Sequence, residues 1–349
     1  LESGKPIQES IVEVDYGASF IEWSAEQALR IKSDIFESPE SGKKLFTIRN
    51  PIGVVAAITP WNFPLAMVTR KVSSAVAAGC AVILKPSELT PITALELGSL
   101  SLEAGFPPGV FNIVNGEPEM IGKVLSTNPV IKKITFTGST EVGKLLMKNS
   151  SSTVKNISLE LGGNAPFIVF SDADLDAALN GFMMAKFRNA GQTCISANRL
   201  FVHKSVSNIF TSKLLERLKK LKVGDGMNGS DIGPLISNEA LKKVINHVSD
   251  AKKNGAKILF GGNKHKLGGL FFEPTLISNV KKNMKVFQKE NFGPIIPLIE
   301  FDNDDEVINM SNETNYGLAA YFYTKNSATI WKNLNNLDYG MFGINSGKI

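Results

Sequence analysis

Short apolar runs rich in β-branched residues alternate with amphipathic stretches along most of the chain. In the first half this pattern predicts strands at residues 54–59, 81–84, 111–114 and 133–136, separated by helices near 68–78, 94–104 and 119–126. After residue 163 the alternation resumes and predicts strands at 166–170 and 200–202, a helix from residue 175 and another that ends near residue 222. Such alternation is typical of βαβ units around a parallel sheet. We therefore predict two α/β domains that meet near Gly162 and Gly163.

Residues 33–51 interrupt this alternation. The segment is polar and turn-rich and then becomes β-like at Leu45-Phe-Thr-Ile48. The pattern predicts a β-hairpin. Its composition is also that of an ordinary surface hairpin, so the residues alone leave its role open.

The composition is that of a globular protein. With 349 residues and 43% hydrophobic content the chain can bury a large core, and its length suits two domains. The net charge of +5 slightly favours an anionic substrate or a dinucleotide. The basic run 213–222 has no interleaved aromatic residues, so we interpret it as a solvated helix face and expect no nucleic-acid partner. No stretch is long and apolar enough for a membrane span, and we expect no membrane partner.

Cysteine and histidine usage narrows the chemistry further. Cys80 and Cys194 are the only cysteines, too few for a disulfide framework in a chain of this length, which indicates a reducing compartment. His203, His247 and His265 are isolated and lack metal-ligand spacing, so we predict no metal site. The chain does not begin with Met, which suggests that it starts inside a longer protein whose targeting peptide lies outside this sequence.

Glu160 in Leu-Glu-Leu-Gly-Gly and Cys194 in Gly-Gln-Thr-Cys are the candidate chemical pair. A thiolate adds to a carbonyl, and the thioester that can form from it is released by a water that a base deprotonates. One cysteine and one glutamate can therefore serve one covalent cycle. A lone cysteine beside glycines is more often a small buried residue, so the pair needs support from the rest of the chain.

That support comes from six motifs. In order they are Thr59-Pro-Trp-Asn-Phe-Pro64, Lys85-Pro-Ser-Glu88, Phe136-Thr-Gly-Ser-Thr-Glu-Val-Gly143, Glu160-Leu-Gly-Gly163, Gly191-Gln-Thr-Cys194 and Glu290-Asn-Phe-Gly-Pro294. Together they resemble the aldehyde dehydrogenase superfamily from the first residues to Ile349. The resemblance implies an α/β fold with a Rossmann-type NAD-binding domain at residues 1–32 and 52–162. It also implies an oligomerisation hairpin at 33–51 and a second α/β domain, catalytic, at 163–349.

A cofactor site is expected at the carboxyl ends of the first-half strands. The strand ending at Phe136 runs into Gly138-Ser139 and a helix start, which can present backbone N–H groups to a pyrophosphate but also fits a tight βα turn capped by Ser139. Lys85 and Glu88 follow another strand, where a surface ion pair is the alternative. The resemblance implies that Glu88 binds the adenosine ribose and disfavours a 2′-phosphate, so we predict NAD, with NADP possible. The cofactor-binding set it implies is Thr59, Trp61, Lys85, Ser87, Glu88, Phe136, Gly138, Ser139, Val142, Glu290 and Phe292.

The resemblance also assigns the chemical roles. Cys194 is the expected nucleophile, Glu160 the base, and Asn62 the donor that stabilises the oxyanion beside the backbone N–H of Cys194. By composition Asn62 could instead cap a helix that starts near Pro64. Lys71 matches a lysine near the family's active site, although its position would otherwise predict a solvated side chain.

Two arginines suggest the substrate class. Arg70 follows the Asn62 motif and Arg188 precedes Cys194, and guanidinium groups bind carboxylates well. This combination resembles the succinate semialdehyde dehydrogenase subfamily, whose members act in 4-aminobutyrate degradation. The alternative for each arginine is a structural ion pair. Glutarate semialdehyde or another ω-carboxylated aldehyde is the alternative substrate, because an arginine pair cannot count methylenes.

The ends of the chain leave a further alternative. The family continues beyond Ile349 with a substrate loop and an oligomerisation strand, so this copy looks incomplete at both ends. A truncated, non-catalytic NAD-binding relative is therefore the alternative from another class. For the complete protein the resemblance implies a homotetramer or homodimer, in the mitochondrial matrix of a eukaryote or the cytoplasm of a bacterium.

Overall fold

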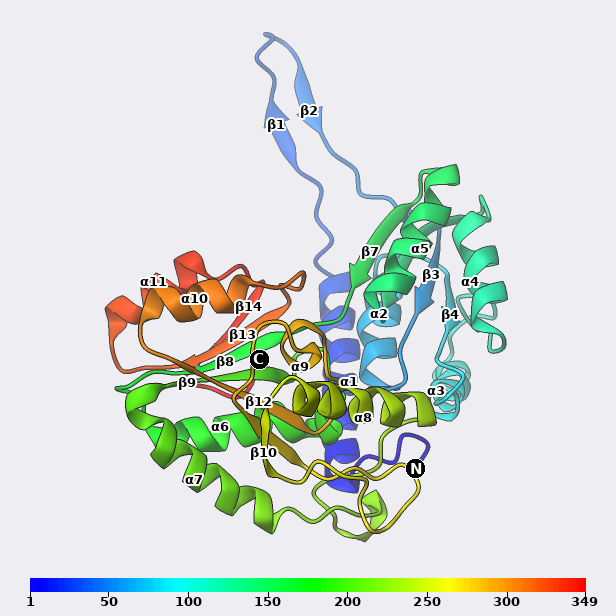
Figure 1. Ribbon diagram of the computed structural model, residues 1–349. Helices are drawn as coiled ribbons and strands as arrows, with labels where there is room; N and C mark the ends of the chain where they lie inside the picture. The colour runs from blue at the N-terminus through cyan, green and yellow to red at the C-terminus, as the bar shows by residue number, and fades with distance from the viewer. The chain divides into compact units, whose positions relative to one another are not determined.

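The computed structural model describes all 349 residues, which divide into two compact units (Figure 1). One unit contains residue 2 and residues 10–161, and the other contains residues 1, 3–9 and 162–349. Each unit has its own mainly parallel sheet with helices between the strands. The predicted α/β class is confirmed. That one unit binds the dinucleotide and the other carries out catalysis stays a prediction.

The unit of residues 10–161 is built on a five-stranded, wholly parallel sheet of order β5-β4-β3-β6-β7. Its strands are β3 (Val54–Ile58), β4 (Val82–Lys85), β5 (Phe111–Ile113), β6 (Ile131–Thr137) and β7 (Asn156–Glu160), and its helices are α1 (Ile7–Ala28), which starts in the other unit, α2 (Ala66–Ala77), α3 (Ile92–Glu103), α4 (Pro118–Thr127), α5 (Thr140–Ser150) and the short η1 (Ser151–Thr153). The predicted strands and helices of this half are confirmed to within two residues at most ends. Central strands such as β3 are covered on both faces, which explains their continuous apolar sequence.

The unit of residues 162–349 contains a seven-stranded sheet of order β10-β11-β12-β9-β8-β13-β14, parallel except for β10. Its strands are β8 (Ala165–Val169), β9 (Ala197–His203), β10 (Lys257–Phe260), β11 (Thr275–Ser278), β12 (Ile295–Phe301), β13 (Ala319–Tyr323) and β14 (Met341–Ile344). Its helices are α6 (Leu175–Phe187), α7 (Lys204–Lys220), α8 (Asn238–Lys253), α9 (Lys285–Gln288), α10 (Asp304–Asn312) and α11 (Ser327–Asn336), with short turns η2 (Arg188–Gly191) and η3 (Gly226–Asn228). Fully buried aromatic residues on β8, β9 and β13 fill its core.

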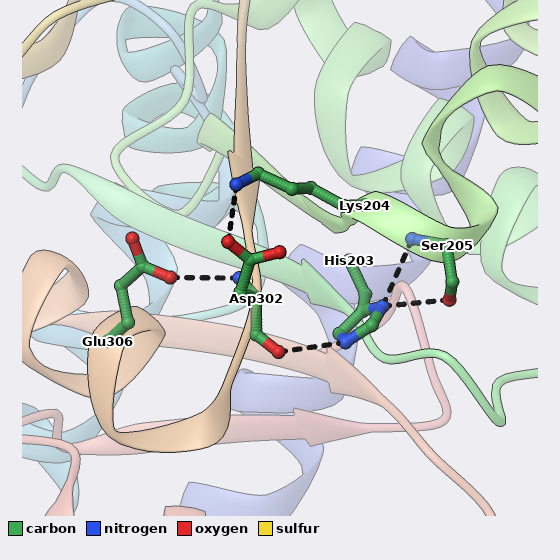
Figure 2. Close-up of polar contacts among 5 residues, drawn as sticks. All are labelled: His203, Lys204, Ser205, Asp302 and Glu306. Atoms are coloured by element: carbon green, nitrogen blue, oxygen red, sulfur yellow. Dashed lines mark hydrogen bonds and ion pairs between the residues drawn. The ribbon is translucent and has the colours of Figure 1, made fainter.

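A polar cluster fixes the turns that follow β9 and β12 (Figure 2). His203 Nδ1 accepts a hydrogen bond from the Ser205 backbone N–H at 3.2 Å, so its Nε2–H donates to the Asp302 carbonyl at 3.0 Å. Lys204 forms an ion pair with Asp302, and Glu306 accepts from the Asp302 N–H at 2.8 Å. His203 and Glu306 bind backbone groups of the two turns, so the histidine here is structural.

Residues 33–51 form the predicted hairpin, in which β1 (Ile35–Glu37) pairs antiparallel with β2 (Lys44–Phe46). Figure 1 shows these strands as a long ribbon. No group of three or more His, Cys, Asp or Glu side chains is arranged to hold a metal ion. None of the helices combines the length and the apolar character that crossing a membrane requires.

Candidate active site

The strand ends of the five-stranded sheet bring together four residues of the predicted site and its surroundings. Ile58 of β3 pairs with Lys85 and Phe136, and Thr137 pairs with Glu160, so β3, β4, β6 and β7 end at one edge. This carboxyl edge is where open parallel sheets bind ligands. The Oγ1 atoms of Thr59 and Thr137 are buried here without a hydrogen-bond partner. Buried hydroxyls are normally satisfied, so these two fit a polar ligand such as a dinucleotide.

Lys85 and Glu88 form a half-buried ion pair at this edge. Lys85 is 4% exposed, and its Nζ donates to Glu88 Oε2 at 2.6 Å. Partial burial acts to raise the pKa of the Glu88 carboxyl, but the Lys85 hydrogen bond brings it below its usual value. Ser87 between them is buried. The ion pair that the sequence left open as the alternative is therefore formed, with the lysine enclosed and the carboxylate reaching solvent, and a ribose-binding role for the two residues stays a prediction.

The glycine turn after β6 is the capped βα turn that the sequence left open as an alternative, and pyrophosphate binding there stays a prediction. Ser139 is the N-cap of α5, and its hydroxyl accepts from the Val142 N–H at 3.3 Å. A Cβ on Gly138 would lie 2.4 Å from the Phe136 ring, so glycine lets the turn fold over that buried ring. Ser139 and Val142 are exposed, which leaves the start of this 11-residue helix open to an anion.

Lys71 is enclosed, contrary to the solvated side chain that its position in the sequence suggests. It is 7% exposed, and its Nζ donates to Thr135 Oγ1 at 3.1 Å. Burial lowers the pKa of Lys71 to about 8, and the negative charge of Glu160 opposes that shift. The structure thus places this lysine within electrostatic range of the predicted base, which lies exposed at the end of β7.

Asn62 does not cap α2. The helix begins at Ala66 without a side-chain cap from its own segment, and the N–H groups of Leu65 and Ala66 donate to Glu13 Oε1 at 2.8 and 3.2 Å. The buried Asn62 amide, 6% exposed, lies in the loop after β3 together with Trp61. The capping alternative is therefore wrong, and a role for this amide in the site stays a prediction.

In the other unit, Cys194 lies on a loop with unusual backbone geometry. Asn189, Ala190 and Gly191 have consecutive positive φ angles of 51°, 56° and 78°, which side chains rarely adopt. Gln192 is fully buried and holds the loop through hydrogen bonds to three backbone groups. The side chain of Cys194 is half-buried. Strain stored at a residue cluster that presents a nucleophile is typical of functional sites.

Glu290 lies beside the same loop. The Gly163 N–H donates to Glu290 Oε1 at 2.8 Å, and a Cβ on Gly163 would lie 2.1 Å from the Cys194 carbonyl oxygen. Only glycine permits this approach. The loop that leads into β8 therefore passes between Cys194, the predicted nucleophile, and Glu290, the predicted ribose ligand. Phe292 follows with a φ of 50°. The structure thus brings Cys194 and Glu290 together.

Arg188 and Arg70 belong to different units. Arg188 is half-buried beside Asn189, whose N–H donates to Glu9 Oε2 at 2.7 Å. Burial raises the pKa of Glu9, opposed by that hydrogen bond and by the charges of Lys5 and Arg188. Arg70 lies on α2 and stacks on aromatic rings of α1.

The sequence missed two supporting residues. Thr137 contributes one of the unpartnered hydroxyls, and Tyr321 donates its OH to the Ile195 carbonyl at 2.8 Å. Burial raises the pKa of Tyr321, as does its proximity to Cys194. Neither stands in a recognisable motif. Only the strand order makes Tyr321 a neighbour of the cysteine loop, so no sequence signal could have identified it.

Comparisons with known proteins identify the family of the chain. The model of the aldehyde dehydrogenase family matches residues 1–349. A probable succinate-semialdehyde dehydrogenase (NADP(+)) of Sinorhizobium fredii is 52% identical over 350 residues. A mitochondrial succinate-semialdehyde dehydrogenase of Arabidopsis thaliana is also 52% identical, and a glutarate-semialdehyde dehydrogenase of Pseudomonas aeruginosa is 50% identical. Each alignment covers all of this chain and 71%, 66% and 72% of the respective relative.

The fold matches equally well. The crystal structure of an Escherichia coli NADP-dependent enzyme superposes with a TM-score of 0.99 at 50% identity, covering 100% of this chain and 73% of that one. The family model, the relatives and the crystal structure all cover the residues at the carboxyl edge of the five-stranded sheet and those of the Cys194 loop. The chain belongs to the aldehyde dehydrogenase family and is an oxidoreductase.

Proposed function

We propose that the protein oxidises succinate semialdehyde to succinate in the degradation of 4-aminobutyrate, with NAD or NADP as the electron acceptor. The main observation behind this proposal is that Cys194 lies half-buried on a strained loop, and that Gly163 packs between this loop and Glu290. The printed names of the Sinorhizobium and Arabidopsis relatives support the substrate.

The chemistry needs one nucleophile, one oxyanion donor and one base. The Cys194 thiolate adds to the aldehyde carbon, and the resulting oxyanion accepts from the Asn62 amide and the Cys194 backbone N–H. A bound nicotinamide supplies a hydride acceptor, and loss of hydride from the thiohemiacetal leaves a thioester on Cys194. Glu160 takes a proton from water, whose hydroxide displaces the thiolate and releases the acid. Burial lowers the pKa of Lys71 to about 8, so the lysine is still mostly protonated at pH 7 and stabilises the Glu160 carboxylate.

The dinucleotide fits the carboxyl edge of the five-stranded sheet. Two buried hydroxyls without partners, on Thr59 and Thr137, and the open N-terminus of α5 offer the polar groups it needs. The adenosine ribose would contact Lys85 and Glu88, and the nicotinamide ribose would contact Glu290. Since the Glu88 charge is balanced by Lys85, we propose NAD with NADP also accepted.

Exchanging Glu88 for glutamine tests this cofactor assignment. Glu88→Gln removes the charge that repels a 2′-phosphate and frees Lys85 to bind it, so kcat/KM for NADP should rise several-fold relative to NAD. The control is Glu96→Gln, which removes an exposed carboxylate of the following helix, α3. An unchanged NADP to NAD ratio would show that the Lys85–Glu88 pair does not face the adenosine ribose.

The substrate assignment is tested by comparing aldehydes with the full-length gene product. We expect kcat/KM to be highest for succinate semialdehyde, lower for glutarate semialdehyde and lowest for butanal, measured by NADH absorbance. A preference for glutarate semialdehyde would favour the second candidate, which the Pseudomonas relative's name supports. Equal values for butanal would remove Arg70 and Arg188 from substrate binding.

The nucleophile is tested separately. Cys194→Ala should abolish turnover while leaving dinucleotide binding intact, because the reactive sulfur is lost and the strand-edge site is not touched. Binding is measured by fluorescence quenching on addition of NADH. Full activity in this variant would refute the covalent route.

The compartment of the protein would follow its source, the mitochondrial matrix in a eukaryote and the cytoplasm in a bacterium.

A further inference from the structure

Arg70 is held by two aromatic rings of the neighbouring helix. Its Cζ lies 4.7 Å from the centroid of Phe20 and 5.7 Å from that of Tyr16, and its guanidinium also donates to the Tyr16 hydroxyl. The two rings pack edge to face with centroids 4.7 Å apart. Arginine over an aromatic face is an attractive arrangement at both exposed and buried sites. We call Tyr16 and Phe20 the aromatic cradle.

The cradle is fixed because α1 and α2 approach closely. A Cβ on Gly17 would lie 2.9 Å from the Leu65 side chain, so glycine permits the contact next to Tyr16. One turn later Ser73 Oγ donates to the Phe20 carbonyl at 3.2 Å, and it lies 3.0 Å from Ser24 Oγ. Contacts at successive turns set the rotation of α1 about its axis. The two rings therefore have one position relative to α2.

No carboxylate of its own unit forms an ion pair with Arg70, so the structural ion pair that the sequence left open is not formed there. The charge rests on ring faces and a phenol oxygen, none of which neutralises it. Arg70 is exposed. A free arginine loses much rotamer freedom when it binds, whereas a stacked one has already lost it. A guanidinium group that is already ordered binds a planar carboxylate more strongly.

We propose that Tyr16 and Phe20 are positioning residues that orient the Arg70 guanidinium and thereby set the preference for carboxylated aldehydes. The inference rests on the proposed function, in which Arg70 binds the distal carboxylate. The rings act through Arg70 and touch no reacting atom, so they should influence substrate KM rather than kcat.

Steady-state kinetics of the full-length enzyme test the proposal, with Tyr16→Leu and Phe20→Leu made singly and together. KM for succinate semialdehyde should rise about threefold in each single variant and about tenfold in the double variant. We expect kcat, KM for NAD and KM for butanal to change less than twofold. Phe20→Tyr keeps a ring over the guanidinium and should restore the wild-type KM.

Trp23→Leu is the matched control, because it removes an exposed aromatic residue of the same helix that does not contact Arg70. Melting temperatures of all variants show whether a change reflects loss of fold. A rise in KM for both aldehydes, or no rise in the double variant, would overturn the cradle.

Arg70→Gln separates this proposal from the proposed function. If it raises KM for succinate semialdehyde while the ring variants do not, the arginine binds substrate and the cradle is refuted. If Arg70→Gln leaves that KM unchanged, the carboxylate-binding role itself fails and the cradle fails with it.

Discussion

Lys186 lies in the last turn of α6 with its ammonium group enclosed by protein. It is fully buried, and its Nζ has no hydrogen-bond partner. Burial alone lowers the pKa of Lys186 from 10.5 to about 7. A buried cation without a partner destabilises the fold, because water solvates it better than the protein does. The residue belongs to no part of the proposed chemistry, so its effect on stability can be measured separately.

Lys186→Met should raise the free energy of unfolding by on the order of 1 to 3 kcal/mol below pH 7. Below pH 7 both states of the wild type are protonated and the penalty is complete. Between about 7 and 10.5 the folded state releases the proton while the unfolded state keeps it, so wild-type stability rises with pH. The advantage of the methionine variant should shrink across that window. Urea melts at about pH 6 and about pH 9 measure it.

Lys219→Met, at an exposed position of α7, is the control and should show no such window. A Lys186→Met variant that is less stable than wild type at low pH would mean that the ammonium group has a favourable partner in solution.

At the residue scale the motifs predicted several local contacts, whereas the roles of these residues in a site stay predictions. Ser139 caps α5, Lys85 meets Glu88, and Cys194 lies beside the Gly163 that contacts Glu290. The first two contacts are predictable because they join residues 3 positions apart along the chain. The Gly163–Glu290 contact joins residues 127 positions apart, and only the resemblance placed Glu290 in the site. The buried Lys71 was not predictable from its own segment, since its enclosure depends on Thr135 of another strand.

At the scale of elements, the loop that leads into β8 packs very closely against the loop that carries Cys194. A methyl group on Gly163 would sit 2.1 Å from the Cys194 carbonyl oxygen, and backbone atoms cannot rotate away. Gly163→Ala should therefore displace the loop that carries the nucleophile. We expect a loss of at least a hundredfold in kcat together with a lower melting temperature.

Gly122→Ala is the control for Gly163→Ala, and its kcat and melting temperature are measured in the same way. Gly122 lies inside α4, and its added methyl would meet only the Leu146 side chain at 3.9 Å. Alanine is the better helix former by about 1 kcal/mol, so this variant should melt higher and keep full activity. If Gly163→Ala kept wild-type kcat, the close packing of Gly163 against the loop would not matter for catalysis.

The same scale explains which elements the sequence missed. The predictions were based on the periodicity of apolar residues, which are expected to be buried. Helix α1 does the reverse, because it buries Glu13, Gly17 and Ser24 and exposes larger apolar side chains such as Trp23. The residues that α1 buries are polar or small, so no hydrophobic stripe marks the helix. Strand β7 is short and alternates in burial, and therefore gave no continuous apolar run.

At the scale of the whole molecule, the β1–β2 hairpin exposes apolar side chains on both of its faces. Ile35 opposite Phe46 and Phe36 opposite Leu45 are between 52% and 75% exposed. An isolated two-stranded ribbon has no core of its own, and apolar surface of this kind marks a protein interface. We propose that it binds a second copy of the chain, as expected for a homodimer or homotetramer.

Replacing one apolar pair of the hairpin by charges should weaken this assembly. Ile35→Glu with Phe46→Lys places opposite charges across the register, so the ribbon keeps a cross-strand pair while its apolar face is lost. Light scattering of the full-length protein should then give a lower mass than the wild type at the same concentration. Exchanging the ion-paired residues, Glu37→Lys with Lys44→Glu, preserves the neighbouring pair, 3.0 Å apart, and should leave the mass unchanged. An equal loss of mass in both double variants would indicate that hairpin folding rather than its apolar surface controls assembly, and no loss in either would assign the interface to another surface.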